Sequence, residues 1–187
     1  GDGATLTADV AKTLGMAFAR YVAQKAGKPI ESVSVALGRD SRVSGPQLLA
    51  AAAEGIASAG AKAVDYGMCT TPAMYMAILT DGFRPDGSIM VTASHHPWQL
   101  NGLKFFTAEG GLGFHELDEV LDLASKMTNP FYQGIFLYRA AKLYYYKNDE
   151  ENCRKLLGEA MEKLKGTAWE VMIRQMLEEN LALVAER

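Results

Sequence analysis

The sequence has little cysteine, no long apolar run and no marked excess of charge of one sign. Of its 187 residues only Cys69 and Cys153 are cysteines, and neither lies in a Cys-x-x-Cys or Cys/His ligand spacing. We therefore expect reduced, buried thiols and a cytoplasmic protein. No apolar run reaches the roughly 18 residues of a membrane span, and the chain starts without the basic and apolar regions of a signal peptide.

The charge balance argues against a nucleic acid or an anionic membrane as partner. The chain carries 19 basic and 22 acidic residues, a formal net charge of −3, with no basic block of the kind that binds nucleic acid or an anionic membrane. Because 49% of the residues are hydrophobic, the chain can build a core without disulfides or a structural metal. These features predict one ordinary globular domain or two small ones.

The composition changes partway along the chain. Residues 1–129 contain 15 of the 18 glycines, and the remainder is poor in glycine and rich in tyrosine and helix-forming residues. The first part alternates short β-type runs with helical patterns, whereas the second has apolar residues only at helical spacing. We therefore predict two domains, residues 1–126 and residues 127–187.

The pattern in the first domain predicts an α/β fold, with a mixed, mostly parallel sheet flanked by helices. The all-α segment that follows has three helical stretches, separated by Asn148–Asp149 and Gly166–Thr167. The expected strands are residues 33–37, 62–66, 88–93 and 103–106, a glycine-rich turn is expected at 109–113, and the expected helices are 8–26, 46–59, 72–79, 115–126, 131–147, 150–165 and 168–186.

Two loops follow predicted strands at their carboxyl ends, where parallel sheets usually carry their sites: residues 38–45 and 94–102. The second loop presents the hydroxyl of Ser94 beside His95 and His96, and Lys104 follows Ser94 by ten residues. Such a serine could act as a nucleophile or phosphate carrier, with the lysine relaying a proton. From spacing alone, ordinary turn chemistry is the more frequent explanation of a Ser-His pair in a loop. A hydrolase elbow is excluded because the chain has no Gly-x-Ser-x-Gly pattern here.

Five segments, in order and at compatible spacings, carry a resemblance to a known family. The chain resembles the first domain of the α-D-phosphohexomutases, the superfamily of phosphoglucomutase and phosphomannomutase, over about residues 1–126. The segments are Gly-Arg-Asp-Ser-Arg-Val-Ser-Gly at 38–45, Gly-Met-Cys-Thr-Thr-Pro at 67–72, Thr-Ala-Ser-His-His-Pro at 92–97, Asn-Gly-Leu-Lys at 101–104 and Gly-Gly-Leu at 110–112.

The resemblance implies an enzyme that moves a phosphoryl group between two hydroxyls of a hexose phosphate through a phosphoserine. Ser94 would carry the phosphate, His95 would be its neighbour in the catalytic loop, and Lys104 would be the general acid/base. Arg39, Arg42 and Asn101 would bind substrate or phosphate. The family also implies Mg²⁺, which this chain would contact only through the phosphate on Ser94, and a hexose 1,6-bisphosphate as activator.

Departures from the family pattern limit this expectation. No Asp-x-Asp-x-Asp run, which holds Mg²⁺ in the family's second domain, occurs in the 187 residues. The Tyr-Asp-Ile-Arg-Gly motif that precedes the first helix in the family is also missing. We therefore expect a catalytic-serine domain that is inactive or weakly active by itself.

The helical segment 127–187 has a weaker likeness. Ala141, Tyr144, Cys153, Leu157 and Ala160 follow the spacing of a tetratricopeptide helix pair, although a simple three-helix core explains the same periodicity. The alternative function is a non-catalytic scaffold that binds a protein partner or self-associates through these helices or exposed domain faces. A fusion or an engineered graft would explain the change of composition. A zinc site of His95, His96 and His115 is disfavoured because adjacent histidines do not easily bind one ion.

Overall fold

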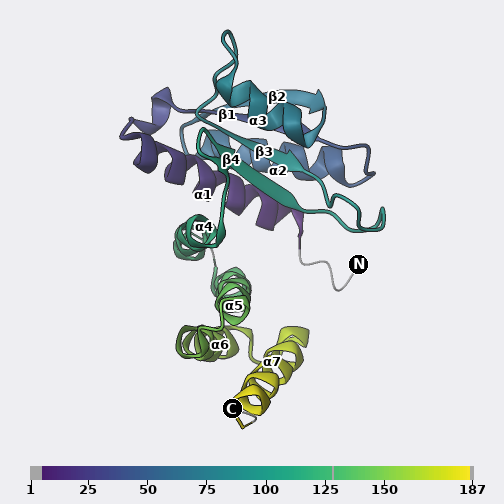
Figure 1. Ribbon diagram of the computed structural model, residues 1–187, viewed down its shortest axis with the longest axis vertical. Helices are drawn as coiled ribbons and strands as arrows, with labels where there is room; N and C mark the ends of the chain where they lie inside the picture. Colours follow the sequence, from purple (N-terminus) through teal and green to yellow (C-terminus); the bar gives the residue numbers. More distant parts are fainter. Residues whose placement is uncertain (1–5, 128, 186–187) are drawn as a thin grey trace. The chain divides into compact units, whose positions relative to one another are not determined.

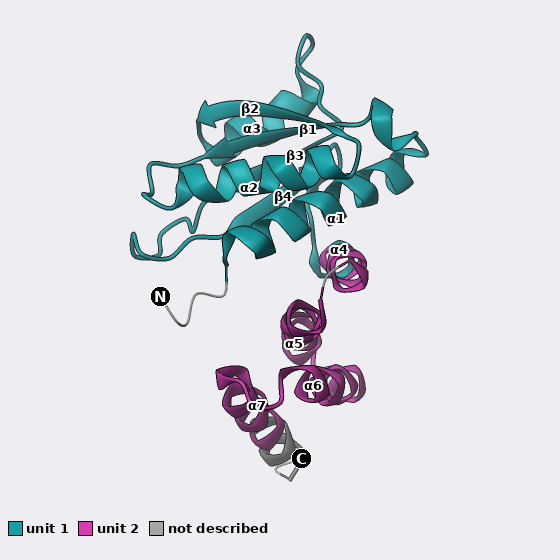
Figure 2. Cartoon of the chain, turned by 180° about the vertical axis from the view of Figure 1, so that it is seen from behind, with its two compact units in different colours: residues 1–116 teal, residues 117–187 magenta. Residues whose placement is uncertain are grey.

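The computed structural model describes residues 6–127 and 129–185, with side chains described as far as Glu178 (Figure 1). The chain divides into two compact units, residues 1–116 and 117–187, shown separately coloured in Figure 2. The division falls inside helix α4 (Phe114–Lys126). The predicted domain boundary after Lys126 stays a prediction.

A mixed sheet forms the centre of the first unit. In the described part of the chain its strand order is β2-β1-β3-β4-β5. Strand β1 is parallel to both β2 and β3, whereas β4 runs antiparallel to β3 and to the short edge strand β5. The fold class predicted from the sequence is thus confirmed. The strands are β1 (Ser34–Arg39), β2 (Lys62–Met68), β3 (Gly87–Val91), β4 (Leu103–Thr107) and β5 (Gly110–Gly111).

Local sequence signals set the ends of the helices around this sheet. The side chain of Thr7 accepts a hydrogen bond from the backbone of Val10 and caps α1, and Gly27 ends that helix in the left-handed conformation, with φ 60°. Thr70 caps α3 in the same way by accepting from Ala73. The helices of this unit are α1 (Ala8–Ala26), the 3₁₀ turn η1 (Ile30–Ser32), α2 (Gly45–Ser58) and α3 (Thr71–Leu79).

Helices cover both faces of the sheet (Figure 1). On one face Phe18 of α1 packs against Phe105 of β4, with ring centroids 5.0 Å apart. On the other face Met74 of α3 forms a buried cluster with Ala36 and Met90. Because side chains alternate between faces along a strand, β1 and β3 bury residues on both sides and form the centre of the core.

Two glycines allow α1 and α2 to cross closely. A Cβ at Gly15 would overlap the backbone carbonyl of Ala52, and a Cβ at Gly55 would overlap that of Lys12. The two helices therefore pack backbone to backbone against the sheet.

The second unit is helical. Gly134 of α5 lies so close to α6 that a Cβ there would be 2.5 Å from Cγ of Leu164. Asn129 and Asp149 cap α5 and α6 by accepting hydrogen bonds from backbone amides. The buried cluster of α5, α6 and α7 includes Ile135, Tyr138, Ala141, Cys153, Leu157, Ala160, Leu164, Ile173 and Met176. These helices are α5 (Pro130–Tyr146), α6 (Glu150–Leu164) and α7 (Ala168–Ala185).

Among the residues that the structure describes, no helix is both long enough and apolar enough to cross a bilayer.

Candidate active site

The carboxyl ends of β1 and β3 bring two loops together. The amide of Asp40, directly after β1, donates to the carbonyl oxygen of Val91 at the end of β3, at 3.1 Å. We call residues 40–44 the arginine loop and residues 92–102 the serine loop. Both were predicted to lie at this edge of the sheet, and the parallel pairing of β1 and β3 places them side by side.

The serine loop is closed at its base by backbone. The amide of Thr92 donates to the carbonyl oxygen of Gly102 at 2.9 Å. A Cβ at position 102 would lie 2.9 Å from the carbonyl oxygen of Thr92, so only glycine fits without a backbone shift. Next to this base, the side-chain amide of Asn101 donates to the hydroxyl of Ser44, at 3.0 Å, and ties the serine loop to the arginine loop.

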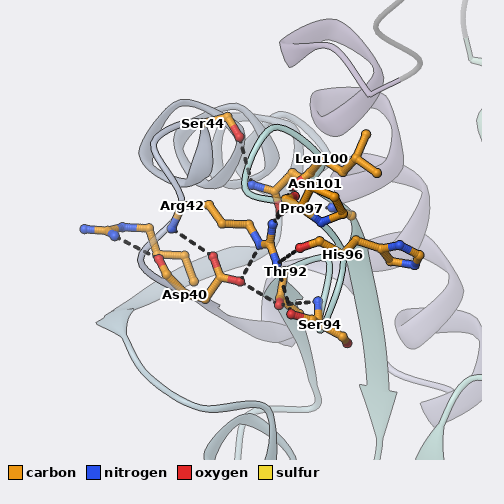
Figure 3. Close-up of polar contacts among 11 residues, drawn as sticks. Asp40, Arg42, Ser44, Thr92, Ser94, His96, Pro97, Leu100 and Asn101 are labelled. Atoms are coloured by element: carbon orange, nitrogen blue, oxygen red, sulfur yellow. Dashed lines mark hydrogen bonds and ion pairs between the residues drawn. The ribbon is translucent and has the colours of Figure 1, made fainter.

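Arg42 crosses from the arginine loop and holds the serine loop through its carbonyl groups (Figure 3). Its Nε donates to Oδ2 of Asp40 at 2.9 Å, and each Nη donates to two backbone carbonyl oxygens. A guanidinium has five N–H groups, so every donor of Arg42 is engaged. The four carbonyl acceptors, at 2.7–3.0 Å, belong to Ser94, His96, Pro97 and Leu100.

Asp40 is the acceptor that fixes Arg42. Its Oδ1 accepts from the backbone amide of Arg42 at 3.1 Å, and its Oδ2 also accepts from the hydroxyl of Thr92 at 2.7 Å. Burial alone would raise the pKa of Asp40, but the hydrogen bonds from Thr92 and Arg42, with the positive charge of Arg42, lower the pKa below its ordinary value. The carboxylate is therefore held in its charged form.

Ser94 has an unusual backbone conformation. Its φ is 53°, in the left-handed region that residues other than glycine seldom adopt. Its amide donates to the hydroxyl oxygen of Thr92 at 3.0 Å, while the residue itself is exposed to solvent. Thr92 is only 6% exposed, so its hydroxyl is a buried link between Ser94 and Asp40.

A pocket of about 410 Å³ lies between the two loops. It combines polar groups with two exposed apolar side chains, Val43 and Trp98, which are 82% and 66% exposed. Such a mixture suits a ligand with both hydroxyl groups and an apolar ring face. The lining residues are Asp40, Ser41, Arg42, Val43, Ser94, His96 and Trp98.

The predicted site residues separate into two groups. Ser94 and Arg42 line the pocket and Asn101 joins the two loops, whereas His95, Arg39 and Lys104 do neither. The side chain of His95 is exposed, and that of Arg39 donates to the backbone carbonyl of Asp40 at 3.1 Å.

Lys104 lies on β4 directly opposite Met90 of β3. Opposed residues of an antiparallel pair share a face, so Lys104 is on the α3 side of the sheet. Its side chain is exposed there and makes no hydrogen bond or ion pair with the residues that the structure describes.

Two residues that link the loops were missed from the sequence, Asp40 and Thr92. Both stand inside recognised motifs, but neither was assigned a role. The available signal was a threonine at the end of the predicted strand, two residues before Ser94, and a carboxylate two residues before Arg42. Spacing of this kind predicts local side-chain to backbone hydrogen bonds, which both residues make.

The residues present do not form a metal site by themselves. Within residues 6–127 and 129–185, no group of three or more His, Cys, Asp or Glu side chains could hold an ion. The carboxylate oxygens of Asp40, which could otherwise bind an ion, already accept hydrogen bonds.

The fold and this edge-of-sheet site define an α/β/α domain that presents a serine on a pinned loop. Residues 2–128 match the family model described as phosphoglucomutase/phosphomannomutase, alpha/beta/alpha domain I, and the chain belongs to this family. The match favours the catalytic-serine domain over the alternative of a non-catalytic scaffold.

Similar proteins include two curated phosphoglucosamine mutases. That of Corynebacterium jeikeium (strain K411) is 45% identical over 105 residues, covering 56% of this chain and 23% of that protein. That of Clostridium acetobutylicum is 37% identical over 130 residues, covering 70% of this chain and 27% of that protein. The chain thus spans about a quarter of the length of these relatives.

A solved structure is also similar. It is a phosphoglucomutase/phosphomannomutase family protein from Burkholderia thailandensis, with a TM-score of 0.57 and 35% sequence identity. The likeness covers 67% of this chain and 28% of that one.

Proposed function

We propose that this chain is the catalytic-serine domain of a phosphohexomutase, in which Ser94 carries the phosphoryl group. The substrates are hexose phosphates. The observation that carries the proposal is the exposed Ser94, held in a left-handed turn beside a pocket at the carboxyl edge of the sheet. Family membership and the names of the curated relatives support it.

The loading step transfers one phosphoryl group from a hexose 1,6-bisphosphate to the chain. A bond forms between phosphorus and Oγ of Ser94 while the bond between phosphorus and the sugar oxygen breaks. The hydroxyl proton of Ser94 passes to solvent, and the sugar oxygen takes a proton from Lys104, the proposed general acid. The reverse transfer to the other hydroxyl of the sugar completes the isomerisation. Such reactions depend mainly on positioning and charge neutralisation.

The remaining predicted residues have supporting roles in this proposal. Because every N–H of Arg42 is engaged, its contribution to phosphate binding is its charge and its hold on the serine loop. Asn101 acts by joining the two loops, and Arg39 adds positive charge at the same edge. His95 is free to contact a ligand next to Ser94.

The family implies Mg²⁺, and a phosphate on Ser94 would be the ligand this chain contributes. We derive no step through the metal, because the described residues offer no cluster to hold it. Full turnover then requires groups beyond those in this chain, which spans about a quarter of the length of its curated relatives.

For the helical unit we propose a tetratricopeptide-like arrangement. Ala141, Cys153, Leu157 and Ala160 are fully buried at the positions where such a helix pair has its small and bulky core residues. Helices α5 and α6 are joined by the short turn at Lys147–Asp149, and α7 packs on the pair through Ile173.

Intact-mass analysis tests the proposed function. The purified chain is incubated with a hexose 1,6-bisphosphate and Mg²⁺, and we expect one added phosphate per chain. Ser94→Ala should gain none. Ser58→Ala is the matched control, because Ser58 is exposed at the carboxyl end of α2, does not line the pocket and should leave phosphate uptake unchanged. Lys104→Met should slow uptake by about a hundredfold, the usual scale of a lost general acid.

Two results would contradict the proposal. One is a wild-type chain that gains no phosphate under conditions that load a complete family member. The other is phosphate uptake that survives in Ser94→Ala or is lost in Ser58→Ala.

A further inference from the structure

We propose that Thr92 and Asp40 are positioning residues for Ser94, acting through a relay of hydrogen bonds from the Ser94 amide to the Thr92 hydroxyl and on to the Asp40 carboxylate. The inference rests on the function proposed above. It concerns how the serine is held for phosphoryl transfer, and neither Thr92 nor Asp40 needs to touch the transferred group.

The direction of each hydrogen bond follows from the donors available. A threonine hydroxyl has one hydrogen, and a carboxylate can only accept. Thr92 therefore donates to Oδ2 of Asp40, at 2.7 Å, and its oxygen lone pair accepts the Ser94 amide, at 3.0 Å. A charged acceptor strengthens such a bond and polarises the hydroxyl toward accepting from Ser94.

Asp40 can fix Thr92 because Asp40 is itself fixed. Oδ1 accepts from the Arg42 amide, and Oδ2 is shared between Nε of Arg42 and the Thr92 hydroxyl. The carboxylate consequently has one orientation, and the hydroxyl of Thr92 has one rotamer that satisfies it. Thr92 is 6% exposed, so water has little access to replace either bond.

The hydrogen bonds of the relay hold Ser94 in an unfavourable backbone conformation. A left-handed backbone is unfavourable for a residue with a Cβ and persists where surrounding contacts hold it. At Ser94 the amide is held by Thr92 and the carbonyl oxygen by Nη2 of Arg42, at 2.9 Å. Both peptide groups that flank the serine are therefore tied, directly or through Thr92, to the Asp40–Arg42 pair.

Two substitutions at Thr92 distinguish the effect of its hydroxyl group from the effect of its side-chain volume. Thr92→Val keeps the shape and removes the hydroxyl, whereas Thr92→Ser keeps the hydroxyl. In the ¹⁵N-labelled chain, we expect the Ser94 amide to exchange with solvent about fivefold to tenfold faster in Thr92→Val, the scale of one lost hydrogen bond. Exchange in Thr92→Ser should match the wild type. Amides of β1 and α1 report whether the fold is intact.

Phosphate uptake from a hexose 1,6-bisphosphate is measured on the same variants. Thr92→Val should take up phosphate about tenfold more slowly, and Thr92→Ser should restore the rate. Asp40→Asn should also accelerate Ser94 exchange, because it weakens the acceptor at the end of the relay. This second variant keeps the test decisive if Thr92→Val folds poorly.

The inference is overturned if Ser94 exchange is unchanged in both Thr92→Val and Asp40→Asn. It is also overturned if exchange accelerates while phosphate uptake keeps its wild-type rate, or if Thr92→Ser restores neither measurement. A wild-type chain that takes up no phosphate contradicts the proposed function instead, and the exchange rates then decide by themselves whether the relay holds Ser94.

Discussion

The carboxylate of Asp40 and the guanidinium of Arg42 form an ion pair inside one short loop, with Nε 2.9 Å from Oδ2. Their side chains are 25% and 10% exposed, so the pair is screened much less than a surface ion pair. The four Nη hydrogens of Arg42 and the second hydrogen bond of Asp40 Oδ2 go to the serine loop. The fixed conformation of the arginine loop therefore also restricts the backbone around Ser94.

Acid should loosen the serine loop. The pKa of Asp40 is lowered in the folded state, so its contribution to stability is complete above the unfolded value of about 3.9 and is lost as the pH falls through the lower folded value. We expect the Ser94 amide resonance to titrate below about pH 4 in a pH series from 7 to 2. Asp40→Asn should remove this titration, while Asp86, which has its own lowered pKa from Lys28 and Ser34, still titrates. A Ser94 resonance that titrates equally in both proteins would contradict the assignment.

Removing the Arg42 guanidinium should expose the serine loop to proteolysis. Arg42→Met loses the ion pair and four carbonyl contacts, and we expect the free energy of unfolding to fall by about 3 kcal/mol. Arg42→Lys should give an intermediate loss, because an ammonium cannot reach all five acceptors. Chymotrypsin cleavage after the exposed Trp98 and urea denaturation measure the two effects.

The control for this prediction is Arg84→Met. Arg84 pairs with Asp81 at the surface, with side chains 66% and 90% exposed, so its loss should change stability by less than about 0.5 kcal/mol. Equal destabilisation by both substitutions would show that Arg42 has no special hold on the loop.

Most of the fold was predictable because its signals are local. Thr7, Gly27 and the apolar periodicity between them mark α1, and the short β-branched runs mark β1 and β3. Strand β5 was predicted as a turn, because its two glycines carry no β signal. It forms through pairing with β4, a long-range contact that sequence periodicity does not report.

The same substitution should have opposite effects in two helices. Gly55→Ala would place a Cβ against the Lys12 carbonyl and should destabilise the first unit by about 2 kcal/mol. Gly158→Ala lies in α6 with nothing within 4 Å of the added Cβ, so it should stabilise the second unit by about 0.5–1 kcal/mol. Thermal unfolding followed by circular dichroism measures both. A neutral Gly55→Ala would mean that α1 and α2 can separate at little cost.

The base of the serine loop should not tolerate a side chain. Gly102→Ala would bring its Cβ to 2.9 Å from the Thr92 carbonyl oxygen, so the backbone segments at residues 92 and 102 must move apart. We expect faster exchange of the Thr92 amide, which donates to Gly102, and a loss of about 1–3 kcal/mol in stability. Unchanged Thr92 exchange would show that the base adapts without losing this hydrogen bond.

The site was predictable only in outline. The sequence predicts the two loops and the position of Ser94, because motifs that follow a strand can be recognised from neighbouring residues alone. It does not give the partners of Arg42, whose four carbonyl acceptors lie more than fifty positions further along the chain. From the sequence, an arginine in such a loop is expected to bind phosphate. Only the structure shows that its N–H groups are already occupied. The roles of Asp40 and Thr92 likewise depend on β1 and β3 being neighbours.

The closure of the serine loop at Thr92 and Gly102 has an entropic consequence. The conformational freedom of this segment is lost when the domain folds, before any ligand binds. Ligand binding then has no loop to immobilise, so its free energy remains for orienting the phosphoryl donor. Phosphate loading of this chain should accordingly have a small entropy of activation and a rate nearly independent of solvent viscosity.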